Sequence, residues 1–321
     1  PVGPDLTAPI PNPMTWAVAP EAGAGSVVVY EGFDYTPSGA VLNGNGDTGF
    51  AGAWSTTHSG ANLFQVQSPG LTFADLPVAG YSASRPANQA RAEASRQLSA
   101  AARAALFTDG STMWFSVLYR KTDSAENAAF VIGSDTFDVA NYSDVNGYTS
   151  GNDEGFGFGS SSAEIAALGY DDLGGMTKVD HTLDLGTTRL IAGKIVWSAN
   201  GTNDTLYLYN VTDLTAEPTV AIATVALDLD QSAFDQVALL GQKSSAIFDE
   251  IRLGTSFASV VGRPDDTEGS ISMTAAAATD PSGVEYYFTE TSGNPGGDDS
   301  GWQDSPVYID DGLQAGTQYS Y

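Results

Sequence analysis

The sequence predicts an all-β protein built from two β-sandwiches. Short runs of alternating apolar and polar residues, bounded by Gly-, Asn- and Asp-rich turns, recur along most of the chain, and 36 of the 321 residues are glycine. Hydrophobic residues make up 42% of the chain, which is enough to form a core. A chain of 321 residues is best divided among two or three domains.

Residues 1–25 are predicted to be extended. Six prolines fall within the first twenty residues, and proline fixes φ and prevents a regular helix. The segment from Thr7 to Trp16 is expected to be an edge strand that belongs to an immunoglobulin-like sandwich elsewhere. The residues expected to carry this assembly strand are Pro9, Pro11, Pro13, Met14 and Trp16.

Residues 26–262 are predicted to form the larger sandwich. The expected strands are 27–35, 63–67, 113–120, 128–133, 155–159, 188–197, 205–210, 220–227, 237–240 and 246–253. One helix is expected, from Ser99 to Leu106, with Ser99 as its N-cap. Residues 89–96 are ambiguous because Ala, Glu and Arg favour a helix there, and the all-β surroundings lead us to expect a strand.

Residues 263–321 are predicted to form the smaller, incomplete sandwich. Beyond Arg263 there is no Lys or Arg, against eleven Asp and Glu, and this change in composition marks the boundary. Strands are expected at 270–275, 284–290 and 306–309, and the last ten residues form a turn and the beginning of another strand. Because a sandwich of this kind needs roughly seven strands, its open edge can accept one more.

The large domain resembles the laminin-G-like, concanavalin A-like jelly rolls of large secreted and surface proteins of environmental bacteria. The resemblance lies in residues 30–35, 49–54, 114–120 and 248–254. The flanks resemble a fibronectin type III-like repeat split around the jelly roll, in residues 7–16, 270–275, 280–288, 301–305 and 312–319. These resemblances imply a jelly-roll β-sandwich plus a smaller Ig/fibronectin III-like sandwich that is incomplete at its C-terminal end.

The split repeat has three explanations. Residues 6–18 fold back onto the same chain, or they pair with a neighbouring molecule, or Tyr321 is only where the sequence in hand ends. Pairing between molecules is heterologous strand addition, and its repetition would build a filament. The beginning at Pro1 and the ending at Tyr321 suggest a processed chain or a piece of a longer protein.

The charge excludes several classes of partner. The chain has 39 acidic and 12 basic residues, a net charge of −27, which argues against nucleic acid and anionic membrane surfaces. No apolar run reaches the roughly 18 residues needed to cross a membrane. The absence of cysteine excludes disulfides and thiolate sites. We expect an extracellular or cell-surface location.

No catalytic residues are predicted. The histidines, His58 and His181, stand in unrelated contexts, and there is no Gly-x-Ser-x-Gly motif. Glycosidases that share the jelly roll carry Glu-x-Asp-x-x-Glu on one strand, and this chain lacks that run. Asp249 and Glu250 are adjacent, so an ordinary strand would point them to opposite faces. The chain is therefore not expected to be an enzyme.

Two kinds of ligand site are expected. The resemblance implies a structural Ca²⁺ beside the first and last strands of the jelly roll, with Glu31, Asp34 and Asp249 as ligands; the alternative is that they are polar turn residues. Exposed aromatics stack on sugars, and we expect Trp54, Tyr148 and Phe156, in or near Gly-rich loops, to do so. The alternative is that they anchor the core.

Four Asn-x-Ser/Thr sequences are candidate glycosylation sites on an exported surface, with chance in a Thr-rich chain as the alternative. They begin at Asn141, Asn200, Asn203 and Asn210.

The function predicted from the sequence is a non-catalytic extracellular structural or adhesive protein that self-associates as a filament subunit by β-strand complementation. The alternative is a carbohydrate-binding accessory module of a secreted polysaccharide-degrading enzyme, with glycans as its partners.

Overall fold

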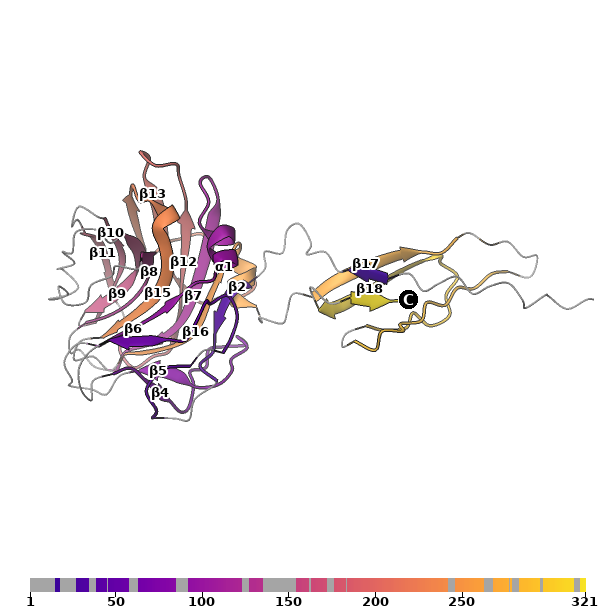
Figure 1. The fold of residues 1–321 in the computed structure, drawn as a ribbon, viewed down its shortest axis with the longest axis horizontal. Helices are drawn as coiled ribbons and strands as arrows, with labels where there is room; N and C mark the ends of the chain where they lie inside the picture. Colours follow the sequence, from indigo (N-terminus) through magenta and orange to yellow (C-terminus); the bar gives the residue numbers. More distant parts are fainter. Residues whose placement is uncertain are drawn as a thin grey trace, which may run out of the picture. The chain divides into compact units, whose positions relative to one another are not determined.

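Contacts along the chain divide it into two compact units. In the computed structural model, a large unit comprises Gly25–Pro264, and a small unit combines Pro1–Ala24 with Asp265–Tyr321 (Figure 1). The structure describes residues 15–17, 27–34, 39–44, 46–57, 63–84, 92–122, 127–134, 154–161, 163–171, 176–182, 184–241, 246–262, 268–276, 278, 283–294, 297–314 and 318–321. Within these residues the chain is almost entirely antiparallel β-structure, which confirms the predicted fold class.

The large unit is a sandwich of two antiparallel sheets. The first, named the β8 sheet after its central strand, has the order β11 (Met176–Thr182), β10 (Glu164–Tyr170), β9 (Gly155–Ser161), β8 (Ala128–Ser134), β15 (Phe234–Gly241), β6 (Ala92–Gln97) and β3 (Ser55–Thr57). The second, the β7 sheet, has the order β14 (Ala223–Leu227), β13 (Asp204–Val211), β12 (Arg189–Val196), β7 (Thr112–Arg120), β16 (Ile247–Gly254), β5 (Ser82–Ser84) and β4 (Gln65–Gln67). Strand β2 (Val27–Glu31) also pairs with β16.

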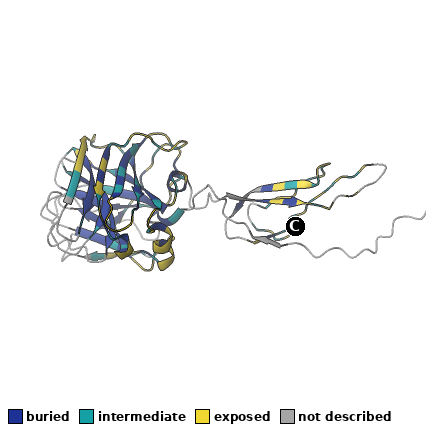
Figure 2. Cartoon of the chain, turned by 90° about the horizontal axis from the view of Figure 1, so that it is seen from above, coloured by how far each residue is buried: buried dark blue, intermediate teal, exposed yellow. Residues whose placement is uncertain are grey.

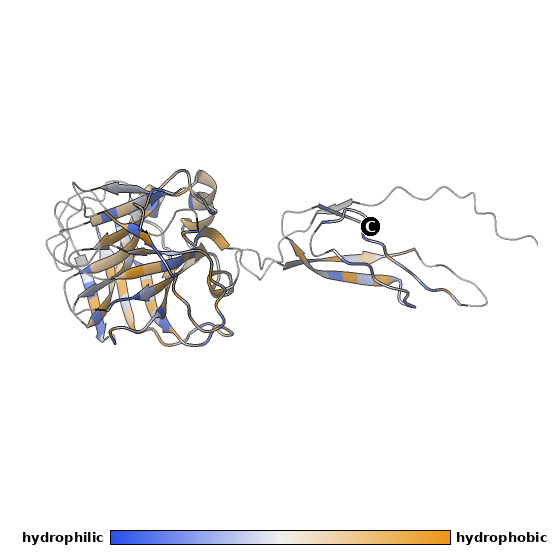
Figure 3. Cartoon of the chain, turned by 90° about the horizontal axis from the view of Figure 1, so that it is seen from below, coloured by the Kyte–Doolittle hydropathy of each residue, from blue (hydrophilic) through white to orange (hydrophobic). Residues whose placement is uncertain are grey.

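The core of the large unit lies between the two sheets and is rich in aromatic rings. Phe115 and Tyr119 of β7 face Phe130 of β8 and Phe158 of β9, with centroids 5.4 Å apart for Phe115–Phe130 and 5.3 Å for Tyr119–Phe158. These contacts arise because side chains alternate across each strand, so one face of every strand turns inward. Figure 2 shows the buried strands, and Figure 3 shows how hydrophobic residues gather on them.

In the large unit, elements that depend on neighbouring residues in the sequence are predicted correctly. Helix α1 (Ala100–Leu106) begins after Ser99, whose hydroxyl accepts the N–H of Ala102 at 3.2 Å, so the predicted cap is confirmed. The ambiguous stretch is a strand, β6, because it pairs with β15. Strands β3, β5, β10 and β11, the 3-10 helix η2 (Gln231–Ala233) and the short helix α2 (Phe257–Val261) were not predicted.

The outer face of the β7 sheet is partly covered by α2. Phe257 of this helix lies edge-on to Trp114 of β7 at 5.3 Å, and Tyr209 of β13 stacks on Trp114 at 5.6 Å. No helix in the described part of the chain is long and apolar enough to cross a membrane.

The small unit contains two strand pairs. Strand β17 (Glu268–Thr274) pairs with β18 (Val307–Gln314), and β1 (Thr15–Ala17) pairs with β19 (Gln318–Ser320), with Trp16 opposite Tyr319. Figure 1 shows β1, in indigo, among the yellow-orange strands of the small unit. The N-terminal strand therefore pairs within its own chain.

The core of the small unit is formed by Ile271, Met273, Leu313 and Tyr319. The predicted strand at 284–290 is wrong. This segment instead forms a single antiparallel bridge, Tyr286 to Gln303, because its hydrogen bonds go to side chains and turns as well as to a neighbouring backbone.

Candidate functional site

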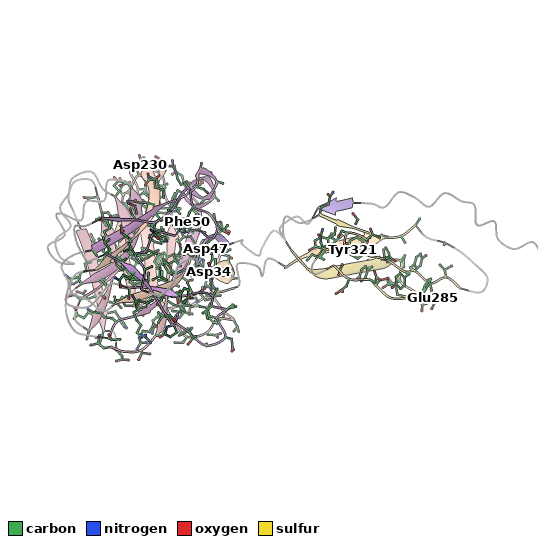
Figure 4. The ribbon with its side chains drawn as sticks, turned by 60° about the horizontal axis from the view of Figure 1, so that its bottom comes forward. Asp34, Asp47, Phe50, Asp230, Glu285 and Tyr321 are labelled. Atoms are coloured by element: carbon green, nitrogen blue, oxygen red, sulfur yellow. The ribbon has the colours of Figure 1, made fainter. Side chains whose placement is uncertain are left out.

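A buried carboxylate cluster lies where β2 and β16 meet in the large unit. We define it as Glu31, Asp249 and Glu250 with Arg96 and Arg252, all of which are at most 2% exposed. Asp34 and Asp47 mark this part of the large unit in Figure 4. Buried charges are stable only when paired or hydrogen-bonded, so the partners of each group decide what the cluster can do.

Glu31 is held from three directions. Its Oε1 accepts the backbone N–H of Phe33 at 2.9 Å, and its Oε2 accepts the indole Nε1–H of Trp54 at 2.6 Å. Oε2 also receives the guanidinium of Arg96, whose other nitrogens donate to the carbonyls of residues 46 and 52. The Glu31 side chain thus ties β2 to β6 and to the loop between β2 and β3.

A β-bulge brings Asp249 and Glu250 into the same cluster. The register between β16 and β7 shifts between Asp249 and Arg252, and Glu250 has a φ of 49°. Positive φ in a residue other than glycine costs energy and persists where the surroundings enforce it. The bulge breaks the alternation of an ordinary strand, so both adjacent carboxylates are buried.

The two carboxylates anchor the loop that precedes β5. Asp249 Oδ2 accepts the N–H of Leu71 at 2.7 Å, and Glu250 Oε1 accepts the N–H of Ala79 at 2.6 Å. Glu250 Oε2 accepts Nη2–H of Arg252 at 2.6 Å. The cluster is therefore an internal cross-link between β16 and a long loop.

Burial changes the acidity of the cluster. It raises the pKa of Glu31 to about 8, a hydrogen bond with Asp47 adds to the rise, and the positive charge of Arg96 opposes it. Burial also raises the pKa of Asp249 well above its usual value, and the neighbouring charge of Glu250 raises it further. Shifted carboxyls can mark a catalytic site, but here they lie away from solvent and accept protein donors.

The residues predicted to bind calcium differ in exposure and in partners. Glu31 and Asp249 are buried and engaged with backbone and side-chain N–H groups, whereas Asp34 is exposed. No group of three His, Asp or Glu residues in the described ranges is placed to hold a metal ion. The calcium site stays a prediction.

The aromatics predicted to stack on sugars lie in the core. Trp54 is 3% exposed, stacks on Phe33 at 5.9 Å and donates its only N–H to Glu31. Phe156 is fully buried beside Trp197 at 6.0 Å. Neither presents a free face, so the structure corrects both assignments; Tyr148 lies outside the described residues.

The remaining predicted residues lie at the surface or outside the described ranges. Asn200 and Asn203 are exposed in the connection between β12 and β13, and Asn210 is half-buried within β13. His181 is exposed on β11. Asn141, His58 and the assembly residues Pro9, Pro11, Pro13 and Met14 lie outside the described residues.

The small unit carries an exposed aromatic pair that the sequence reasoning missed. Trp302 is 70% exposed and Tyr287 is 42% exposed, and their ring centroids lie 5.3 Å apart with the planes tilted by 60°. The Tyr287 hydroxyl donates to Asp299 Oδ2 at 2.9 Å, and Asp299 Oδ1 accepts the N–H of Glu290 at 2.7 Å. Glu285, two residues before Tyr287, marks this segment in Figure 4.

A signal for this pair was present in the sequence. Trp302 follows a glycine in a polar, Asp-containing stretch, where a large aromatic has few apolar neighbours to pack against. Tyr287 belongs to an aromatic run whose exposure alternates, so that residues 285, 287 and 289 face solvent.

A shallow depression lies on the β8 sheet. Its lining residues are Val131, Gly133, Ser134, Tyr170, Gln236 and Ala238, and it encloses about 0 Å³, so it has no room for even a water molecule. Ligand pockets usually enclose about 300–1,000 Å³. We therefore take the aromatic pair as the candidate site.

Comparisons with known proteins identify no family. No protein-family model and no curated protein matches the chain. Among solved structures, peanut lectin with a nine-residue peptide is 11% identical, with 63% of this chain and 97% of that chain covered and a TM-score of 0.37. The carbohydrate-binding module CBM66 from Bacillus subtilis is 11% identical, with coverages of 68% and 98% and a TM-score of 0.30.

A third likeness is to galectin LEC-6 of Caenorhabditis elegans, at 6% identity, with coverages of 46% and 87% and a TM-score of 0.28. Similarities this distant support no conclusion about a ligand. The fold assignment rests on the strand pairings described above.

Proposed function

We propose that this chain is a non-catalytic, extracellular carbohydrate-binding protein that uses the Tyr287–Trp302 pair as its sugar-binding surface. The observation that carries the proposal is the exposure of these two rings. Large aromatic side chains are mostly buried in folded proteins, and an exposed aromatic surface marks an interaction site. Tyr and Trp combine an apolar face, suited to the C–H face of a sugar ring, with a polar tip.

The pair is held in place before any ligand arrives. The Tyr286–Gln303 bridge, with N–H···O distances of 2.7 and 3.0 Å, joins the two segments that carry the rings. Asp299 fixes the Tyr287 hydroxyl. A rigid aromatic surface loses little side-chain entropy on binding, which favours affinity.

Polar groups beside the rings can accept sugar hydroxyls. Asp299 is exposed and keeps free lone pairs after accepting one hydrogen bond at each oxygen. Hydrogen bonds from a hydroxyl to a carboxylate are stronger than those between neutral groups. An aromatic surface flanked by a carboxylate is therefore suited to a polyhydroxylated ring.

The buried carboxylate cluster supports the non-catalytic part of the proposal. General acid–base chemistry requires a carboxyl group within hydrogen-bonding reach of a substrate. Glu31, Asp249 and Glu250 are 0% exposed and bonded within the protein. Their role is to fasten the large unit, which would act as a stable extracellular scaffold.

Strand pairing within the chain favours glycan binding over filament formation. Filament formation was motivated by an unattached N-terminal strand, and β1 is paired with β19 of the same chain. The proposed protein would then act as a surface adhesin or as an accessory module of a secreted polysaccharide-degrading enzyme.

A glycan array compares the wild type with Trp302→Ala and, as a matched control, Val220→Ala, which removes an 80% exposed apolar side chain in the large unit. We expect saturable binding that falls about tenfold in Trp302→Ala, equivalent to ~1.4 kcal/mol, and is unchanged in Val220→Ala. Tyr287→Phe keeps the ring and should lose less. Equal binding by wild type and Trp302→Ala, or no glycan binding at all, would refute the proposal.

A further inference from the structure

We infer that the ligand of the aromatic pair is cationic, namely a polymer of amino sugars that carry free protonated amines. This inference rests on the proposed function and specifies its ligand class. Three observations carry it: the charge of the small unit, the exposed carboxylates near its two rings, and the absence of a basic side chain from the sequence of this unit.

The small unit has no basic side chain of any kind. Neither Lys, Arg nor His occurs in residues 1–24 or 265–321, whereas Asp and Glu occur twice in the first segment and eleven times in the second, thirteen in all. The unit thus carries about half of the net charge of −27 in roughly a quarter of the chain. A field of one sign repels anionic ligands and concentrates cationic ones.

Exposed carboxylates lie near both rings along the chain. Glu285 and Tyr287 are both exposed, and so are Trp302 and Asp304. Residues two apart in any chain are at most about 7 Å from each other. An amine on a sugar that covers either ring would therefore lie within reach of a carboxylate.

Aromatic rings in the large unit already hold cations of the same chain. Lys194 Nζ lies 5.3 Å from the ring centroid of Trp114, and the guanidinium of Arg96 lies 4.0 Å from that of Phe50. Cations are attracted to the face of an aromatic ring, most strongly to Trp. Because the small unit has no cation of its own, the face of Trp302 is left for one supplied by a ligand.

The open geometry favours a ring-shaped ligand over a single ammonium group. Recognition of an isolated ammonium relies on a cage of several rings, and here two tilted rings form an exposed surface. A sugar ring covers more of such a surface than a lysine side chain does, and it places its amine at the edge, near the carboxylates.

The test measures binding of the full chain to a glucosamine oligomer, to the N-acetylated oligomer of the same length, and to a galacturonate oligomer. Binding is measured by titration calorimetry at 20 mM and 500 mM NaCl. At 20 mM NaCl the glucosamine oligomer should bind at least tenfold more tightly than the acetylated oligomer, and at 500 mM NaCl this preference should be smaller. The galacturonate oligomer should not bind. Glu285→Gln/Asp304→Asn should lower the glucosamine preference and leave the acetylated oligomer unaffected. Asp213→Asn, an exposed change in the large unit, is the control.

The outcomes separate this inference from the proposed function. Equal, Trp302-dependent binding of glucosamine and its acetylated form would overturn the inference and leave the proposed function standing. Absence of binding to all three oligomers would overturn the inference, and absence of binding to every glycan on the array would overturn both. Glucosamine binding that survives Trp302→Ala, or a tetralysine peptide that binds as tightly through Trp302, would also overturn the inference, in favour of unspecific attraction or a basic peptide ligand.

Discussion

Replacing Arg96 with methionine should strongly destabilise the large unit. Arg96 is 2% exposed, pairs with Glu31, donates to the carbonyls of residues 46 and 52 at 2.6 and 2.8 Å, and packs on Phe50. Methionine has a similar length but donates no hydrogen bond, so Glu31 is left buried without its counter-charge. Removing one member of a buried ion pair costs about 3–5 kcal/mol.

Urea unfolding at pH 8.5 measures this cost, with Arg103→Ala on the exposed side of α1 as the control, expected within about 0.5 kcal/mol of the wild type. The double variant Glu31→Gln/Arg96→Met should be less destabilised than the sum of its single variants, by about 0.5–3 kcal/mol. Because Arg96 lowers the pKa of Glu31, the cost of Arg96→Met should shrink at pH 5, where Glu31 is protonated. A cost under 1 kcal/mol, or strict additivity, would refute this account.

Three further predictions concern the stability of the large unit. Burial raises the pKa of Glu31 from 4.5 to about 8. The contribution of Glu31 to the free energy of unfolding is therefore fully present below pH 4.5 and is lost as the pH rises through 8. Urea unfolding across this pH range measures the loss, and a free energy of unfolding that rises with pH would contradict the raised pKa. Calcium and EDTA should leave the melting temperature unchanged, since Glu31 and Asp249 already accept protein N–H groups; a rise of several degrees with Ca²⁺ would instead establish the calcium site. Ser99→Ala should cost about 0.5–2 kcal/mol by removing the cap of α1, and Ser99→Thr should restore most of it in the same unfolding assay.

Features set by neighbouring residues could be predicted from the sequence. Helix α1 needed only an alanine-rich run and a capping serine next to it. Alternating apolar residues predict the strands that fill the core of the large unit, and the fold class was therefore predictable. The strand at β6 could be predicted only from the all-β surroundings. Its own composition favours a helix, but pairing with β15 makes it a strand.

Features set by distant residues could not be predicted. Trp54 follows a Gly-rich loop, which suggests an exposed ring, but its indole N–H donates to Glu31, 23 positions earlier in the sequence. Asp249 and Glu250 lie in one cluster because of a β-bulge, and no sequence pattern predicts that bulge. Tyr287 and Trp302 each had a local signal in the sequence, but their contact depends on the Tyr286–Gln303 bridge, which joins segments that are separate in the sequence.

Trp302 is the residue expected to contact the glycan. Oxidation by N-bromosuccinimide, followed by peptide mapping in a mass spectrometer, tests it without a substitution, because Trp54, Trp114 and Trp197 are at most 3% exposed and Trp302 is 70% exposed. The account predicts that Trp302 is oxidised before these three residues in the free protein and that a saturating glycan slows its oxidation at least tenfold. An oxidation rate at Trp302 that is the same with and without bound glycan would contradict it.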